Sequence, residues 1–142
     1  MENFTKNFTY DELIKSTTAE KLGLDNTPNS TEKEKLRQLA VNILQPIRDA
    51  LEKPIKVNSA YRSEKVNKAV GGVSNSQHRL GEAADLTLGS KEKNKQLFEL
   101  ISKLIKNKQL TVGQLINEYS YAWIHVSLPR VNKKNNQIFS IG

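Results

Sequence analysis

Hydrophobic residues recur at helical spacing in two long segments of the chain. In the first, apolar residues between positions 36 and 51 follow the 3.6-residue period closely, which predicts an amphipathic helix. Thr31 to Glu34 has the Thr-x-x-Glu pattern of a capping box, so we expect this helix to begin there. Pro46 lies inside the pattern and should kink the helix or shift its last turn. The second helix is predicted after Ser90, and its expected buried face consists of Leu97, Leu100, Ile101, Leu104 and Ile105.

Two short helices are predicted as well. Residues 9–12 carry another capping-box pattern, with Thr9 as the expected N-cap. Ser63 is expected to cap a helix that runs through Val70, where two glycines follow. The polar segment 16–30 contains glycine and proline, and we predict a surface loop there.

Alternation of apolar and polar residues predicts several short strands. The expected strands are residues 54–61, 83–88, 112–118 and 122–128, with a final edge strand at 137–141. A tight turn at residues 119–121 should join the third strand to the fourth. Helices and antiparallel strand pairs are mixed without a βαβ rhythm, which predicts an α+β fold, and residues 1–142 are expected to form a single domain.

Composition narrows the possible partners. The chain has no cysteine, so disulfides and thiolate metal sites are excluded. With 22 basic and 15 acidic residues the net charge is +7, which favours anionic partners such as nucleic acid, anionic membranes or cell-wall polymers. The lysines are scattered and no nucleic-acid-binding signature is present, so we expect no nucleic-acid partner. No apolar run is long enough for a transmembrane helix, and we expect a monomer without membrane insertion.

Histidine is scarce and draws attention to a candidate metal site. The only two histidines are His78 and His125. Asp85 lies between two apolar residues of a predicted strand, where a buried carboxylate is costly unless it binds a metal or pairs with a group such as a buried arginine. Two imidazoles, one carboxylate and an open fourth position are a frequent arrangement in catalytic zinc sites. These residues therefore predict one catalytic metal ion.

The spacing of these residues suggests how they meet. His78 and Asp85 are seven positions apart, too far for one helical face. The spacing suits a loop that carries His78, turns at Gly81 with a positive φ, and enters the strand of Asp85. In the later strand, alternation places His125 and Trp123 on one face, where Trp123 would form a wall of the pocket.

These residues also match a known family. Ser76, His78, Gly81, Ala83 and Asp85 are spaced as Ser-x-His-x-x-Gly-x-Ala-x-Asp. This spacing matches in full the motif of the M15 family of zinc peptidases, which includes D-Ala-D-Ala carboxypeptidases and dipeptidases and L-alanyl-D-glutamate endopeptidases of bacterial cell walls and phage lysins. Residues 59–63 resemble the family's Ser-x-Tyr-Arg-Ser segment, and residues 123–125 resemble its Trp-x-His end. Residues 44–48 are similar to a helix of the small phage and prophage branch, and the resemblance extends roughly over residues 8–128.

The resemblance implies a fold and roles for particular residues. It implies the hedgehog/DD-peptidase fold and one Zn²⁺ per chain. The implied zinc ligands are His78, Asp85 and His125. Arg62 would hold substrate or the developing oxyanion, for which a guanidinium is a suitable donor, although a surface salt bridge is the alternative. Ser76 would orient the first histidine or contact substrate, although it could equally cap a turn.

The general base departs from the family pattern. Relatives often carry an acidic residue three positions before the last histidine, and that position is Ala122 here. Glu118, seven residues before His125, is the only nearby carboxylate, and it ends an otherwise apolar strand. We expect Glu118 to be the general base that takes a proton from water. If its side chain lies on the outer face of the strand, the site is modified or uses another base.

The expected function follows from these residues and the resemblance. We expect a zinc metallopeptidase that hydrolyses an amide bond in peptidoglycan stem peptides, as a phage or prophage endolysin. It would be made in the host cytoplasm without a signal peptide and would act on the cell wall after release. One alternative is a D-Ala-D-Ala carboxypeptidase of wall remodelling. Another is a catalytically inactive zinc-binding module of the wall or virion, which Ala122 favours.

Overall fold

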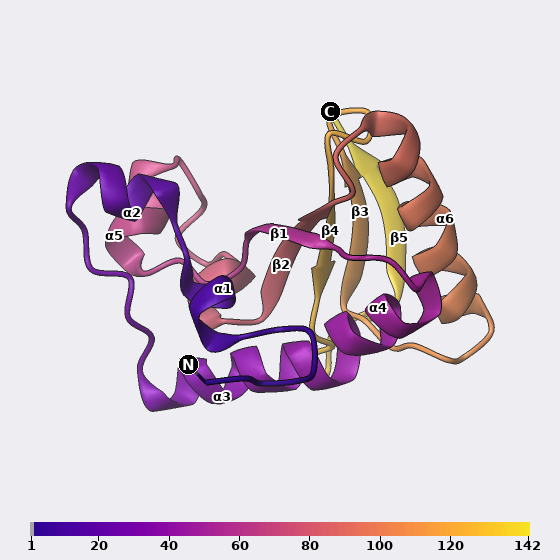
Figure 1. Cartoon of the computed structure of the whole chain (residues 1–142), viewed down its shortest axis with the longest axis horizontal. Helices are drawn as coiled ribbons and strands as arrows, with labels where there is room; N and C mark the ends of the chain where they lie inside the picture. The colour runs from indigo at the N-terminus through magenta and orange to yellow at the C-terminus, as the bar shows by residue number, and fades with distance from the viewer. Residues whose placement is uncertain (1) are drawn as a thin grey trace.

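A five-stranded sheet forms the centre of the protein in the computed structural model, which describes residues 2–142 (Figure 1). The strands are β1 (Lys56–Ser59), β2 (Ala83–Thr87), β3 (Gln114–Glu118), β4 (Trp123–Ser127) and β5 (Gln137–Ile141). Their order across the sheet is β1-β2-β4-β3-β5. Neighbouring strands are antiparallel except for β3 and β5, which run parallel. The predicted α+β fold with a mostly antiparallel sheet is confirmed.

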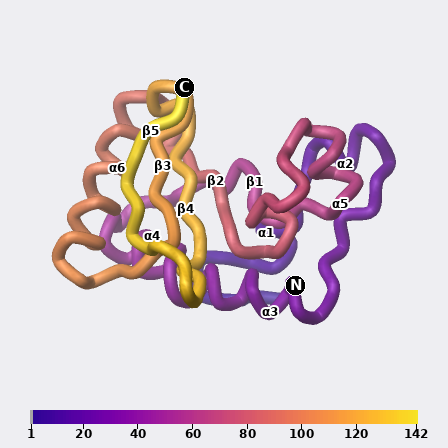
Figure 2. The backbone as a smooth tube through the Cα atoms, turned by 180° about the vertical axis from the view of Figure 1, so that it is seen from behind, coloured from indigo at the N-terminus to yellow at the C-terminus, as the bar shows by residue number. Residues whose placement is uncertain are grey.

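Helices surround this sheet on several sides. They are α1 (Tyr10–Ile14), α2 (Thr17–Leu22), α3 (Ser30–Leu39), the π-helical η1 (Ala40–Leu44), α4 (Gln45–Leu51), α5 (Glu64–Ala69), the 3₁₀-helical η2 (Gln77–Leu80) and α6 (Lys91–Lys106). Figures 1 and 2 show α1, α2 and α5 beyond the β1 edge, whereas α6 lies beside the other strands. Within residues 2–142, none of the helices has the length and apolar character needed to cross a membrane.

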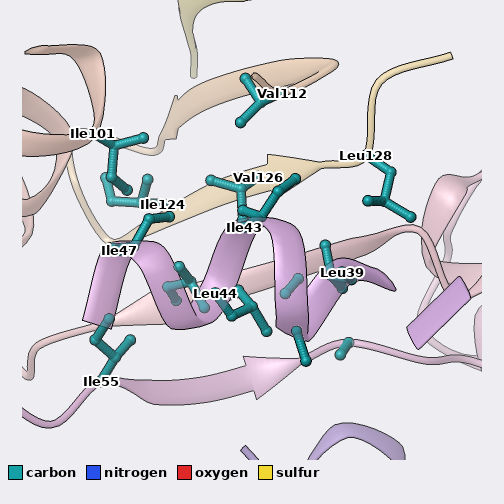
Figure 3. Close-up of a cluster of buried hydrophobic side chains, with 14 of the residues drawn as sticks. Leu39, Ile43, Leu44, Ile47, Ile55, Ile101, Val112, Ile124, Val126 and Leu128 are labelled. Atoms are coloured by element: carbon teal, nitrogen blue, oxygen red, sulfur yellow. The ribbon is translucent and has the colours of Figure 1, made fainter. Parts of the chain in front are cut away.

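One face of the sheet is buried under a continuous helical rod. The segments α3, η1 and α4 follow one another without a break, and their apolar side chains pack against β4 and α6 (Figure 3). Among the fully buried members of this core are Leu39, Ile43, Leu44, Ile47, Ile101, Ile124 and Val126. Since successive strand residues point to opposite faces, burial of Ile124 and Val126 turns Trp123 and His125 toward the other face.

The helical rod becomes π-helical just before Pro46, the residue that was predicted to kink the helix or shift its last turn. Residues 40–44 are π-helical, and the Gln45 N–H donates to the carbonyl of Ala40, five residues earlier. Pro46 is the second residue of α4 and has no N–H to donate to the preceding turn, and the π-helical residues lie directly before this helix. The helix therefore continues past the proline, with a local change from α-helical to π-helical winding at residues 40–44.

Two predictions about the first third of the chain are wrong. Residues 17–22 form α2 inside the expected loop, because Ser16 caps its start and Gly23, with φ +66°, ends it. The capping box of α3 uses Asn29 and Glu32, two positions before the predicted one. Asn29 Oδ1 accepts from the Glu32 N–H at 2.8 Å, and the Tyr61 hydroxyl donates to Glu32 at 2.9 Å, so a tertiary contact selects this register.

The other predicted helix starts are confirmed. Thr9, Ser63 and Ser90 each accept a hydrogen bond from the backbone N–H three residues on, at the starts of α1, α5 and α6. The expected edge strand is β5, and the predicted turn between β3 and β4 is present but spans residues 119–122, so that β4 begins one residue later than predicted.

Gly81 fixes how the segment carrying His78 meets the rest of the fold. Its φ is +77°, in the left-handed region that favours glycine. A Cβ atom at this position would lie 2.6 Å from the carbonyl oxygen of Glu32 in α3. Gly81 therefore allows both the sharp exit from η2 and its close approach to α3.

We predict that Gly81→Ala destabilises the protein much more than Gly23→Ala. Gly23 also has a positive φ, but a Cβ there meets open space, so its substitution should cost only about 1–2 kcal/mol of backbone strain. Gly81→Ala adds a backbone clash, and its total cost should exceed about 2–3 kcal/mol. Urea denaturation of the metal-free proteins measures both free energies of unfolding. Equal losses for the two variants would contradict the close contact with α3.

Candidate metal centre and active-site cleft

Three side chains that the sequence singled out meet on the sheet face opposite the core. His78 comes from η2, Asp85 from β2 and His125 from β4. One donor atom of each lies within 4.8 Å of the other two. Asp85 and His125 are directly paired in the β2–β4 ladder, so sheet register alone brings two of the three together.

The donor atoms are close enough together to bind a single metal ion. Asp85 Oδ1 lies 2.9 Å from His125 Nδ1 and 3.3 Å from His78 Nε2. Two donors at zinc-ligand distance from a tetrahedral ion are about 3.3 Å apart, as bond lengths of about 2.0–2.1 Å dictate. The donor set of two imidazoles and one carboxylate therefore fits a divalent transition metal such as Zn²⁺.

The ring of His78 is oriented for metal binding by a backbone group. Its Nδ1 lies 2.8 Å from the carbonyl oxygen of Ala60. A carbonyl only accepts hydrogen bonds, so Nδ1 carries the proton and Nε2 presents its lone pair toward Asp85. This second hydrogen bond is typical of metal-ligating histidines, because it fixes both the tautomer and the ring orientation.

The Asp85 carboxylate divides its two oxygens between different partners. Oδ1 faces the two imidazoles, and Oδ2 lies 3.5 Å from Nη2 of Arg62. Burial by itself would raise the Asp85 pKa, but its close contacts with the rings of His125 and His78 hold the pKa well below its usual range. The carboxylate is therefore ionised at neutral pH. The two expected roles of this buried carboxylate are therefore compatible: Oδ2 pairs with an arginine, and Oδ1 is free to bind a metal.

Arg62 lies inside the cleft and is held by several groups. Its Nε donates to Ser59 Oγ at 3.1 Å, and Nη1 donates to Asn67 Oδ1 at 3.4 Å. Its side chain is only 18% exposed, so the alternative of a surface salt bridge does not hold. Burial lowers the Arg62 pKa, and the charges of Asp85 and Glu118 oppose that shift. The guanidinium is thus a preorganised cation beside the donor cluster.

Glu118 faces the cleft. In the β3–β4 ladder Ile116 is opposite His125 and Glu118 is opposite Trp123, so Ile116 and Glu118 share the face that carries His125. Glu118 Oε2 lies 3.8 Å from His125 Nδ1, and its side chain is 19% exposed. The alternative that Glu118 lies on the outer face of its strand therefore does not hold.

Ser76 and Trp123 also line the cleft, whose volume is about 520 Å³. Ser76 Oγ accepts from the His78 backbone N–H at 3.2 Å and caps η2, which is the turn-capping alternative. The Trp123 ring packs on Tyr119 with ring centres 5.1 Å apart. Its Nε1 is buried and has no hydrogen-bond partner within residues 2–142, so an unused donor stands in the cleft wall.

Sequence reasoning missed several cleft residues, among them Gln77, Gln114 and Arg130. Gln114 alternates with Ile116 and Glu118 along β3, so the period of two contained the signal that could have found it. Arg130 follows β4 in a segment without periodicity, and no local pattern indicated its position.

The sequence of this chain is similar to those of known proteins. The family model described as Peptidase M15 matches residues 6–127. A segment of 48 residues, 33% of this chain, is 54% identical to a zinc D-Ala-D-Ala carboxypeptidase of Streptomyces albus G. That match spans only 19% of the length of the relative.

We predict that the purified protein binds one Zn²⁺ per chain and that His125→Ala abolishes stoichiometric binding. The substitution leaves two of three ligands, and Asp85 loses the imidazole 2.9 Å away. Glu118→Gln is the matched control, because it changes a cleft residue outside the donor set and should keep one equivalent. Elemental analysis after dialysis against a weak chelator measures the zinc content of both variants. One full equivalent retained by His125→Ala would overturn the assignment of the donor set.

Proposed function

We propose that this chain, which belongs to the peptidase M15 family, is a zinc-dependent hydrolase that cleaves an amide bond in peptidoglycan stem peptides. The proposal rests on one observation. The cluster of His78, Asp85 and His125 lies in the same cleft as the Glu118 carboxylate and the Arg62 guanidinium. The name of the Streptomyces albus G relative, a zinc D-Ala-D-Ala carboxypeptidase, supports both the metal and the substrate class.

The three donors would hold the metal with a net positive charge. Two neutral imidazoles and one carboxylate leave the ion partly uncompensated, because Asp85 supplies the only negative charge among the donors. A bound Zn²⁺ supplies Lewis acidity, which polarises the scissile carbonyl and lowers the pKa of water. Arg62 Nη2, 3.5 Å from the second oxygen of Asp85, helps to orient this carboxylate.

Glu118 is the proposed general base. Its carboxylate stands in the cleft 3.8 Å from a donor atom of the metal cluster, so a water held beside the cluster would lie within reach of proton transfer. Glu118 accepts the proton of the attacking water and returns it to the leaving amine. Ala122 provides no titratable group, and the position of Glu118 supports an active enzyme over the inactive zinc-binding module.

Arg62 is the proposed stabiliser of the developing oxyanion. Its guanidinium is held by Ser59 and Asn67 before substrate arrives, so little reorganisation accompanies the build-up of negative charge. Ser76 is unsuited to nucleophilic attack, because its hydroxyl accepts the His78 N–H and both imidazoles face Asp85 instead. Direct attack by water without a covalent intermediate fits this arrangement.

The proposal extends to a phage or prophage endolysin that is made in the host cytoplasm and acts on the wall after release. The net charge of +7 supports it, because it attracts the protein to anionic wall polymers. A D-Ala-D-Ala carboxypeptidase is the second candidate, favoured by the name of the relative.

Product analysis tests the proposal and separates the two candidates. We expect the zinc-loaded protein to cleave the synthetic stem pentapeptide L-alanyl-γ-D-glutamyl-L-lysyl-D-alanyl-D-alanine. Mass spectrometry should show free L-alanine for an endopeptidase or free D-alanine for a carboxypeptidase. A chelator should stop the reaction and added Zn²⁺ should restore it. No product from this peptide or from whole peptidoglycan, with zinc bound at one equivalent, would reject the enzyme.

Glu118→Gln should retain zinc and lose turnover. Removal of a general base typically lowers kcat by about 10²–10⁴-fold, whereas KM should change little because the side chain keeps its shape. Glu99→Gln is the matched control, since Glu99 is an exposed residue of α6. Steady-state kinetics on the cleaved peptide measure both variants. Unchanged kcat in Glu118→Gln would assign the base to another group.

A further inference from the structure

A second pocket of about 320 Å³ lies beside the metal cleft. It shares Gln77, Gln114 and Arg130 with that cleft, so the two form one continuous depression. Its other wall is the segment that follows β4 and leads into β5, coloured orange-yellow to yellow in Figure 2. Lys133 and Lys134 of this segment also line the pocket.

The segment that builds this pocket is held in place by side-chain amides. Asn135 Oδ1 accepts from the Arg130 N–H, and Asn135 Nδ2 donates to the Arg130 carbonyl, both at 3.0 Å. Asn136 Oδ1 accepts from the Val112 N–H at 2.9 Å, and the Asn136 N–H donates to the Val112 carbonyl at 2.7 Å. The lysines are therefore carried by a loop that is tied to itself and to the sheet.

The pocket is electrostatically unlike the metal end of the cleft. Its lining includes three cations and no acidic residue. Arg130 is paired with the largely buried Glu82, whose Oε1 lies 2.9 Å from Nη2 and 3.0 Å from Nε. Lys133 and Lys134 have no ion-pair partner among the described residues. The metal end instead carries the carboxylates of Asp85 and Glu118.

The distance between the second pocket and the metal cluster can be measured along strand β3. Ile116 is opposite His125, and Gln114, which lies at the boundary of both pockets, precedes it by two residues. Two strand residues span about 7 Å. A group bound in the second pocket thus lies roughly two to three residues of extended peptide from an amide at the metal cluster.

We propose that this second pocket is a subsite for a carboxylate of the peptide substrate, bound by Lys133 and Lys134. The inference rests on the proposed function, because peptidoglycan stem peptides carry free carboxylates a short distance from their amide bonds. Binding there would orient an extended peptide along β3. Arg130, fixed by Glu82, forms the cationic wall that joins the subsite to the cleft. Specificity would come from this anchor in addition to the shape of the cleft.

Peptide binding measured by fluorescence tests the subsite. Trp123 is the only tryptophan and lines the cleft, so its emission reports occupancy. The zinc-loaded Glu118→Gln protein, chosen to avoid turnover, is titrated with the stem pentapeptide and with two derivatives. One derivative carries an amide at the D-glutamyl α-carboxylate, and the other carries an amide at the C-terminus. We expect one of the two amides to bind about tenfold more weakly, which corresponds to about 1.4 kcal/mol.

Lys133→Ala/Lys134→Ala in the same background should remove this discrimination. The double variant should bind the free pentapeptide about tenfold more weakly and the discriminated amide with unchanged affinity. Lys133→Arg/Lys134→Arg should keep the discrimination. Lys91→Ala/Lys95→Ala removes the same charge from exposed positions of α6 and should bind all three peptides as the parent does.

The outcomes separate the subsite from the proposed function. The subsite would be overturned if Lys133→Ala/Lys134→Ala still discriminated between the peptides or weakened the binding of all three equally. It would also be overturned if the parent protein bound none of the peptides or did not discriminate between them. Loss of discrimination in that variant, together with no cleavage by the wild-type protein, would support the subsite and reject the peptidase. Cleavage without any effect of the lysines would support the peptidase and reject the subsite.

Discussion

Burial of the Asp85 carboxylate is the constraint on which the site depends. An ionised carboxylate removed from water costs several kcal/mol unless both oxygens find partners. Here one oxygen faces His78 and His125 and the other faces Arg62. These partners come from η2, β4 and the segment after β1, so the charge is compensated only when all of these segments are in place. The site and the sheet therefore form together.

The register of the strands brings the site residues together. Ser59, Asp85, His125 and Ile116 lie in one row across β1, β2, β4 and β3, and they share one face. The opposite face of the same strands packs on the rod of α3, η1 and α4. A slip of one residue in β4 would bury His125 and expose Ile124, which the hydrophobic core opposes. The core thus selects the register that the donor cluster needs.

Much of the sheet and the donor cluster was predictable from the sequence, whereas several other elements were not. The strands and the placement of His125 were predictable because alternation and chemistry agree, with Ile124 on the core face and His125 on the cleft face. The start of α3 was not, since Asn29 and Thr31 both begin a capping pattern and only the distant Tyr61 hydroxyl distinguishes them. Helix α2 was missed because a six-residue helix with few apolar residues has no clear period. The segment of Lys133 and Lys134 has no period at all, so its position beside the cleft follows from the fold alone.

The turn between β3 and β4 places Glu118 on the face of the donor cluster. Residues 119–121 all have positive φ, and left-handed backbone costs about 1–2 kcal/mol at each non-glycine residue. Asn117 accepts from the Tyr121 N–H at 2.6 Å, and Asn94 donates to the carbonyls of Tyr121 and Ala122, so side chains on the core side hold the turn. This tight turn ends β3 beside the start of β4 and keeps Glu118 on the face of the donor cluster. Distance across the sheet, rather than distance along the chain, is what a general base must satisfy. Glu118, the proposed base, reaches to within 3.8 Å of His125 Nδ1 from β3.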